Sequence, residues 1–229
     1  MKVLTQRKSV TPKAVIFDMD GLLIDSEQVY FKSFKQTSSI FNVTNCDDIF
    51  FKILGQNHVG TLKILSTEFG CSDFSRQFEK QWSLEAHKLF QHPIDIKPGV
   101  HDLLIALDRQ RIPYAVATGN MTETAMLLLQ KCGLGSVFSI IIGGDQVENG
   151  KPEPDIYLKA AEALHIRPGH CAVFEDSENG VRAGLAAGMS VFQVPDMVEP
   201  TDEFRNLGHT ILDSLRAGPM ALGLEAKNR

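Results

Sequence analysis

Cysteine is scarce in this sequence and is never clustered. The chain has four cysteines in 229 residues, at positions 46, 71, 132 and 171. No Cys-x-x-Cys pair occurs, and no histidines stand at the spacing of metal ligands, which argues against a zinc site and against a disulfide framework. The pattern is typical of reduced thiols in a cytosolic protein.

Long apolar runs and an excess of positive charge are also missing. No run approaches the roughly 18 apolar residues of a membrane span, and residues 1–13 are basic and polar, without the apolar core of a signal peptide. We therefore expect a cytoplasmic protein without a membrane partner. The formal net charge of −5 supplies no basic surface that would displace counterions from DNA or RNA, so we expect no nucleic-acid partner either.

The overall composition is that of a folded globular protein, with 43% hydrophobic and 22% charged residues. Short apolar runs predict the strands of a sheet. These runs cover residues 14–17, 112–117, 138–142 and 171–174, and two further candidates cover 190–194 and 210–212. Each of the first four runs ends in polar or glycine residues.

Helical stretches alternate with these strands. Apolar residues recur at three- and four-residue spacing in 100–110, 122–132, 155–164 and 179–187. This alternation predicts parallel strands joined by right-handed crossovers, and hence an α/β fold with a Rossmann-like, doubly wound sheet. Ligands bind at the carboxyl ends of the strands in such sheets, so the polar strand ends should converge on one crevice.

A long segment after the first strand interrupts this alternation. It is rich in Phe, Lys, Gln and Ser, it predicts amphipathic helices, and prolines punctuate its return to the sheet. We predict a core of residues 1–25 and 97–229 that carries an inserted helical cap of residues 26–96. The tail after Leu215 is predicted to be loosely ordered.

Two carboxylates follow the first strand. Asp18 and Asp20 stand two residues apart, and Gly21 lets the chain turn sharply after them. Both can then face the crevice, with Asp18 as a nucleophile toward phosphorus and Asp20 as the acid that protonates the leaving oxygen and later deprotonates water. The alternative interpretation is a helix N-cap or a surface turn, where Asp and Gly are common.

Thr118, Gly119 and Asn120 follow the second long strand and precede a helix. A hydroxyl and backbone N–H groups at the positive end of a helix form a suitable cradle for a phosphoryl group. Asn120 followed by Glu123 is also an ordinary helix-start signal, so structural capping is the alternative interpretation. The two roles are compatible because the same N–H groups can serve both.

Lys151 lies between a glycine and two prolines that fix the backbone before a helix. A lone lysine is usually a solvated charge. Here the rigid neighbours can aim the ammonium group, so that it offsets the repulsion between Asp18 and a phosphate.

Glu175 and Asp176 close the fourth run and join Asp18 and Asp20 in a carboxylate-rich cluster. Such a cluster requires a cation. Oxygen ligands beside a phosphate favour Mg²⁺, which takes one or two carboxylates together with phosphate oxygens. Calcium would accept the same ligands but is a poor match for phosphoryl transfer.

Taken together and in this order, the motifs are specific. The sequence resembles the haloacid dehalogenase superfamily of phosphohydrolases, in its subgroup of β-phosphoglucomutase-like proteins. The matching segments are FDMDGLLIDSE (17–27), ATGN (117–120), GKPEPDIY (150–157) and FEDSENGVRAGLAAGM (174–189). The resemblance covers the core motifs residue by residue, and the cap by its position and helical character.

The resemblance implies that Asp18 is the nucleophile and Asp20 the general acid and base. The implied phosphate-binding residues are Thr118, Gly119, Asn120 and Lys151, and the implied metal-binding residues are Asp18, Asp20 through its backbone carbonyl, Glu175 and Asp176. Dehalogenases of the superfamily lack the second aspartate, so the presence of Asp20 favours phosphoryl transfer. We therefore predict a magnesium-dependent phosphatase that acts on a small phosphorylated metabolite through an aspartyl-phosphate.

A β-phosphoglucomutase-type mutase is the alternative enzyme. Mutases of the subgroup typically carry a histidine where this chain has Tyr30, and a cap arginine three residues after a glycine, where this chain has His58 after Gly55. A mutase must hold a second phosphate, and losing the arginine removes a natural clamp for it. Tyr30, Gly55 and His58 are instead candidate substrate contacts in the cap.

The substrate class stays open at the level of the sequence: sugar phosphates, polyol phosphates and nucleoside monophosphates all fit. A different kind of protein, a non-catalytic module that binds a phosphometabolite, is a further alternative. Such a module would be expected to have lost one of the residues that carry the chemistry, and all of them are present.

Overall fold

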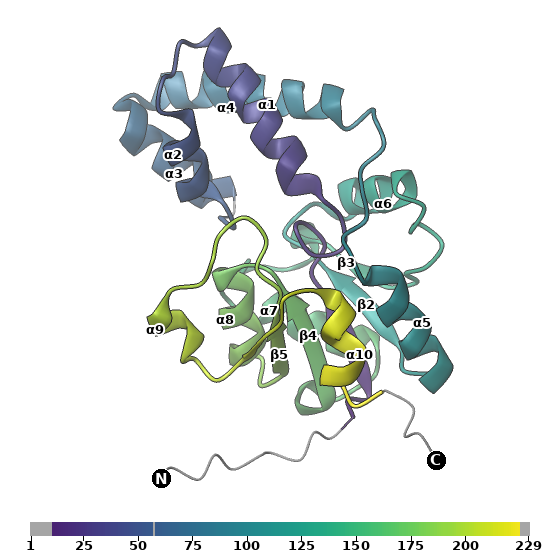
Figure 1. Cartoon of the computed structure of the whole chain (residues 1–229). Coiled ribbons are helices and arrows are strands. Elements are labelled where there is room, and N and C mark those ends of the chain that lie inside the picture. The colour runs from purple at the N-terminus through teal and green to yellow at the C-terminus, as the bar shows by residue number, and fades with distance from the viewer. Residues whose placement is uncertain (1–10, 57, 225–229) are drawn as a thin grey trace.

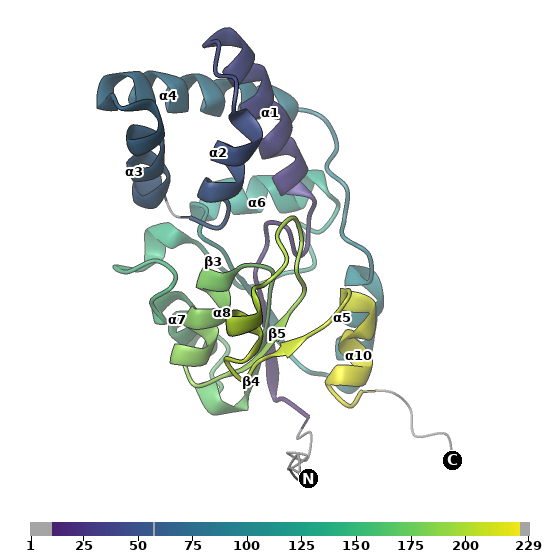
Figure 2. The same ribbon diagram turned by 60° about the vertical axis from the view of Figure 1, so that its left-hand side comes forward.

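The computed structural model describes residues 11–56 and 58–224. Six parallel strands form one sheet in the order β3-β2-β1-β4-β5-β6. The strands are β1 (Ala14–Phe17), β2 (Tyr114–Ala117), β3 (Ile141–Ile142), β4 (Cys171–Glu175), β5 (Ser190–Gln193) and β6 (Thr210–Ile211). The predicted Rossmann-like α/β fold with a helical cap is confirmed, and Figures 1 and 2 show the sheet below the cap.

Two strands are shorter than the sequence predicts. β2 begins after Pro113, whose nitrogen has no hydrogen to donate to a neighbouring strand. β3 contains only two residues at the edge of the sheet, because Phe138 turns inward and packs edge-on against Phe17 with the ring centroids 6.1 Å apart. Apolar runs mark the buried position of both segments, but not where pairing starts.

Helices cover both faces of the sheet, as the alternation predicts. They are α5 (Val100–Gln110), α6 (Thr122–Lys131), α7 (Asp155–Ala163) and α8 (Glu178–Ala186). Successive residues of β1 face opposite cores: Val15 and Phe17 pack on the side of α5 and α6, whereas Ala14 and Ile16 pack on the side of α7 and α8. This two-sided burial explains why the strand reads as continuously apolar.

The cap is built from four helices between β1 and α5: α1 (Ser26–Ile40), α2 (Cys46–Ile53), α3 (His58–Phe69) and α4 (Ser72–Leu89). They enclose an interior of their own, whose buried members are Phe34, Ile49, Phe50, Ile53, Leu65 and Phe78. No helix in the described part of the chain is both long enough and apolar enough to span a bilayer. The predicted domain boundaries at 25/26 and 96/97 stay a prediction.

Two linkers that run side by side join the cap to the core. The Asp25 amide donates to the Asp95 carbonyl at 2.9 Å, and the Lys97 amide donates to the Leu23 carbonyl at 3.0 Å. The Lys97 ammonium also forms an ion pair with Asp196, from the loop after β5. The linkers are therefore paired to each other and to the core.

The chain after residue 215 is ordered up to residue 224, so the prediction of a loose tail is wrong for this segment. A 3₁₀ turn, η3 (Leu215–Ala217), leads into α10 (Gly218–Ala221). Leu215, Leu222 and Leu224 are buried in the main core. Hydrophobic burial against α5 fixes a segment whose glycine and proline favoured disorder in the sequence, while residues 225–229 lie outside the described residues.

Candidate active site

Three strands deliver the polar residues to one edge of the sheet. Asp18 follows β1 and is 6% exposed, Thr118 follows β2 and is fully buried, and Glu175 ends β4 and is fully buried. The backbone fixes these positions, because the Asp18 amide donates to Phe174 and the Thr118 amide donates to Ile142, both at 3.0 Å. The convergence expected from the parallel sheet is confirmed.

Lys151 reaches this edge from the loop before α7. Its ammonium forms ion pairs with Asp18 and with Glu175 Oε1, the latter at 2.5 Å, and donates to the Ala117 carbonyl at 3.2 Å. Burial lowers the pKa of the ammonium, but the charges of Asp18 and Glu175 outweigh it and raise that pKa well above its usual value. Lys151 is therefore a buried cation placed directly against the candidate nucleophile.

The Glu175 carboxylate is held by donors on both oxygens. Oε1 accepts from Lys151 and from the Tyr157 hydroxyl at 2.6 Å. Oε2 accepts from the Asp176 amide at 3.0 Å, and from both the amide and the hydroxyl of Ser177 at 3.1 Å. Burial raises the pKa of Glu175, but Lys151 and these hydrogen bonds hold it below its ordinary value. Glu175 is therefore an ionised anchor for the lysine.

Asp20 is oriented by three side chains. It accepts from Ser26 Oγ at 2.6 Å, from Asn120 Nδ2 at 2.8 Å and from Thr118 Oγ1 at 3.2 Å. Burial raises the pKa of Asp20, and the three hydrogen bonds partly offset this rise. A fixed carboxyl group whose pKa is raised is suited to carry a proton toward a leaving group.

Asp18 also belongs to an acidic cluster that does not include Asp20. Among the described residues, ligand oxygens of Asp18, Glu175 and Asp176 all lie within 4.8 Å of one another. Burial, followed by the charges of Glu175 and Asp18, raises the pKa of Asp176 well above its ordinary value. A divalent cation would relieve this repulsion, and a set of carboxylate oxygens fits Mg²⁺. The Asp20 carboxylate is not in this group, because it faces Ser26 and Asn120.

The turn after β2 holds the predicted phosphate-binding residues. The Asn120 amide donates to Thr118 Oγ1 at 3.1 Å, and the Asn120 carbonyl accepts from the Gly144 amide at 2.8 Å. Asn120 is not the cap of the next helix: α6 begins after Met121, and Asp145 accepts from the Thr122 amide at 2.6 Å. The side chain of Asn120 donates instead to Asp20, so the interpretation of Asn120 as the helix cap is wrong, although the helix starts at Thr122 as predicted.

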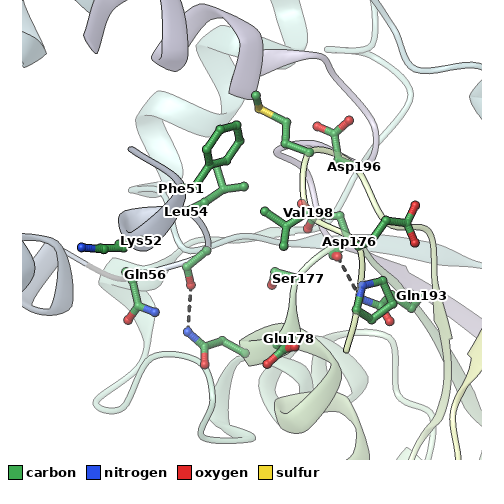
Figure 3. A pocket seen from close by; sticks show the side chains of 15 residues that line it. Phe51, Lys52, Leu54, Gln56, Asp176, Ser177, Glu178, Gln193, Asp196 and Val198 are labelled. Atoms are coloured by element: carbon green, nitrogen blue, oxygen red, sulfur yellow. Dashed lines mark hydrogen bonds between the residues drawn. The ribbon is translucent and has the colours of Figure 1, made fainter. Parts of the chain in front are cut away.

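A cavity of about 220 Å³ lies between the cap and the part of the core around Asp176 (Figure 3). Its lining comes from the end of α2 and the loop after it, the segment 176–179, Gln193 and the loop 196–200. The Asn179 side chain donates to the Gly55 carbonyl at 2.8 Å, so a cap loop is tied to the segment that follows Asp176. The predicted cap residue Gly55 therefore lies at the site.

The other two cap predictions have different surroundings. Tyr30 packs its ring on Phe90, with centroids 5.0 Å apart, and burial together with the nearby charge of Asp20 raises the pKa of its hydroxyl. His58 is exposed on α3 and lies 3.6 Å from Glu79 of the same cap. The structure thus brings Tyr30 toward Asp20, whereas His58 does not line the described cavity.

Residues 15–194 match the model of the haloacid dehalogenase-like hydrolase family. The chain belongs to this family. The predicted resemblance is therefore confirmed, and so is the enzyme class, a phosphatase-type hydrolase.

Individual relatives of this haloacid dehalogenase-like hydrolase are similar over most of their length. A phosphorylated carbohydrates phosphatase from Thermotoga maritima is 35% identical over 77% of this chain and 82% of its own. A β-phosphoglucomutase from Bacillus subtilis is 29% identical over 77% of this chain and 80% of its own. A crystal structure of a family hydrolase from Deinococcus radiodurans R1, with bound phosphate and sodium, is 28% identical and has a TM-score of 0.77, covering 94% of this chain and 98% of that one.

Several residues of this hydrolase site were missed by reasoning from the sequence. Ser26 orients Asp20, and Tyr157 contacts Glu175 from within α7. Both lie inside the matched motifs, so their positions could have been noticed. A serine and a tyrosine carry no charge, however, and the pattern of charged residues therefore assigned them no role. Lys97 and Asp196 are paired across 99 residues of sequence, and no local pattern could have connected them.

Proposed function

We propose that this hydrolase is a Mg²⁺-dependent phosphatase that cleaves a small phosphorylated metabolite through a phosphoryl group carried on Asp18. The observation that supports this most is the buried ion pair of Lys151 with Asp18, in which the same lysine also contacts Glu175. A lysine in this position neutralises the nucleophile's own charge, which would otherwise repel an incoming phosphate.

In the first step, a carboxylate oxygen of Asp18 attacks phosphorus while the bond from phosphorus to the leaving oxygen breaks. Asp20 gives its proton to that oxygen, which departs as an alcohol. The hydrogen bonds from Ser26 and Asn120 hold the carboxyl group of Asp20 in place for this transfer. Mg²⁺, when held by Asp18 and Asp176, would supply positive charge beside the phosphate oxygens.

In the second step, water attacks phosphorus and the bond to the Asp18 oxygen breaks. Asp20 takes a proton from the water, so inorganic phosphate leaves and both aspartates return to their starting states. Thr118 lies between Asp20 and the amide of Asn120, where its hydroxyl can turn toward a phosphate oxygen. Lys151 stays paired to Asp18 throughout.

The cavity of about 220 Å³ between the cap and the core adjoins the candidate site through Asp176, and its volume is below the range of roughly 300–1,000 Å³ typical of drug-sized ligands. This volume supports a small leaving group. It is lined by polar groups from both sides, including Asp196, Gln193 and Lys52. The Thermotoga maritima relative is named for phosphorylated carbohydrates, which agrees with a small polar substrate. Sugar and polyol phosphates are therefore the first compounds to test.

A mutase is the second candidate, favoured by the similarity to the Bacillus subtilis β-phosphoglucomutase. Such an enzyme would return the phosphoryl group from Asp18 to a sugar hydroxyl instead of to water. The residue in the position of the mutase histidine is Tyr30, whose ring packs on Phe90 of the cap linker region. A tyrosine offers no positive charge to a second phosphate, and this favours hydrolysis.

The deciding experiment measures phosphate release from a panel of sugar, polyol and nucleoside monophosphates, with Mg²⁺ and with EDTA. We expect release from one or a few members in Mg²⁺ and none in EDTA. The variant Asp18→Asn should lose at least about 10⁴-fold in kcat because no nucleophile remains. Conversion between hexose phosphate isomers without release would establish the mutase, and activity retained in Asp18→Asn would exclude the proposed nucleophile.

A further inference from the structure

Tyr157 is the largest fully buried side chain in the described part of the protein, and it contacts the catalytic edge of the sheet. It lies in the first turns of α7, six residues after Lys151. Its hydroxyl donates to Glu175 Oε1 at 2.6 Å. The Lys151 ammonium lies 5.0 Å from the centroid of its ring. One side chain thus touches both partners of the buried ion pair.

Shape alone does not explain a tyrosine here. A phenylalanine would fill the same space among the apolar residues of α7 and the sheet, without a polar atom that must find a partner in a dry interior. The hydroxyl does find a partner, and it is the carboxylate oxygen that also receives Lys151. The hydrogen bond is therefore a link to the charged cluster.

The lysine is shared between two carboxylates. Lys151 contacts Asp18 and Glu175 at once, so its position reflects the balance between their attractions. A hydroxyl that donates to Glu175 Oε1 withdraws part of that oxygen's capacity to accept, which weakens its hold on the ammonium. The ammonium also lies over the face of the Tyr157 ring, which limits where it can move.

We propose that Tyr157 is a positioning residue of the phosphatase: its hydroxyl occupies Glu175 Oε1 and its ring confines Lys151, so that the ammonium stays against Asp18. The inference rests on the proposed function. Lys151 offsets the charge that gathers between Asp18 and the phosphoryl group during transfer, so Tyr157 should affect the chemical step more than binding of the leaving group.

The test is Tyr157→Phe, which removes one oxygen atom and keeps the ring. We expect kcat to fall about tenfold while KM changes less than twofold, and the inhibition constant of orthovanadate, a mimic of the transferring phosphoryl group, to rise by a similar factor. Tyr114→Phe is the matched control, because its hydroxyl contacts Asp108 at 3.1 Å, away from the site. Circular dichroism at the assay temperature would show that both variants are folded.

A double variant distinguishes a positioning role of Tyr157 from a merely structural one. If Tyr157 acts through Lys151, then adding Tyr157→Phe to Lys151→Met should cause no further loss of orthovanadate affinity. Equal losses in both backgrounds, or an unchanged kcat in Tyr157→Phe, would overturn the positioning role. Failure of the proposed function is distinguishable, because the wild-type protein would then release no phosphate at all.

Discussion

The interior of the cap and the catalytic edge of the core, the end of the sheet around Asp18, Lys151 and Glu175, are stabilised by different interactions. In the cap interior, Phe34 packs on Phe78 with ring centroids 5.1 Å apart and on Trp82 at the same distance. Around Asp18, the buried groups are charged: Lys151 and Glu175 form an ion pair, and Glu175 also accepts from the amides of Asp176 and Ser177. Apolar packing tolerates changes of shape better than a buried charge network tolerates the loss of a partner.

This difference suits the division of work in the proposed reaction. The residues that handle the phosphoryl group come from strand ends and a rigid loop, whose backbone is fixed by the sheet. The residues that face the rest of the substrate come from the end of α2, which is joined to the core through Asn179 and the paired linkers. In the proposed reaction, the chemistry is thus placed on residues that the sheet holds in position, and the contacts with the rest of the substrate on the cap.

The largest effect on activity and stability is expected from Lys151→Met, at the charged end of the sheet. Removing the cation leaves Asp18 and Glu175 buried without their partner, so we expect kcat to fall by about 10²–10³-fold and the free energy of unfolding to fall by about 3 kcal/mol. Phosphate release and urea unfolding in EDTA would measure the two effects. Lys159→Met, which removes a charge from α7, the helix that follows Lys151, is the control, and comparable losses in both variants would contradict the special role of Lys151.

A second variant tests the apolar interior of the cap. Phe78→Ala should lower the free energy of unfolding by about 3–4 kcal/mol, because Phe78 is fully buried and contacts three phenylalanine rings. Hydrogen exchange should accelerate in α1 and α4 but not in α5 to α8, if the cap interior is an independent core. Leu84→Ala, at an exposed site on α4, is the control. Equal acceleration throughout would show that the cap and core unfold together.

The sheet and the charged residues at its edge could be predicted because their signals are local. The apolar run of residues 14–17 predicts a buried strand, and Asp18 directly after it indicates a reactive carboxylate at the end of that strand. Strand ends were less predictable: β3 was expected to start at Phe138, but that side chain turns into the core instead of pairing. Where an apolar residue packs depends on neighbours distant in sequence.

The order of the site's members was predictable, but their partners were not. The motifs indicated that Asp20 and Lys151 face the crevice. They did not indicate that Ser26 would hold Asp20, a contact set by the turn between β1 and α1. Nor did they indicate that Asp145 would cap α6 in place of Asn120, because that contact depends on how β3 is placed beside β2. The tail after Leu215 shows the same limit, since its leucines are buried against α5, more than a hundred residues earlier.

The smallest expected effect concerns Glu27, which lies on the first turn of α1 where the cap meets the site. Burial, followed by the charges of Asp20 and Asp196, raises the pKa of Glu27 from 4.5 to about 8. The folded protein therefore keeps this proton at pH values where the unfolded chain has lost it, so the unfavourable contribution of Glu27 to stability grows as pH rises from about 4.5 to about 8.

Glu27→Gln cannot titrate and should escape this loss. We expect the free energy of unfolding of the variant to exceed that of the wild type by on the order of 1–2 kcal/mol between pH 5 and pH 8. This is less than the full pKa shift would give, because the Glu27 side chain is only half-buried. Urea unfolding in EDTA at several pH values would measure it, since a bound cation would add its own charge to the site. Glu123→Gln, which removes an exposed carboxyl from α6, controls for net charge. If the gain of Glu27→Gln were the same at every pH, Glu27 would ionise in the folded protein much as it does in the unfolded chain, and the charge repulsion of the catalytic edge would not extend into the cap.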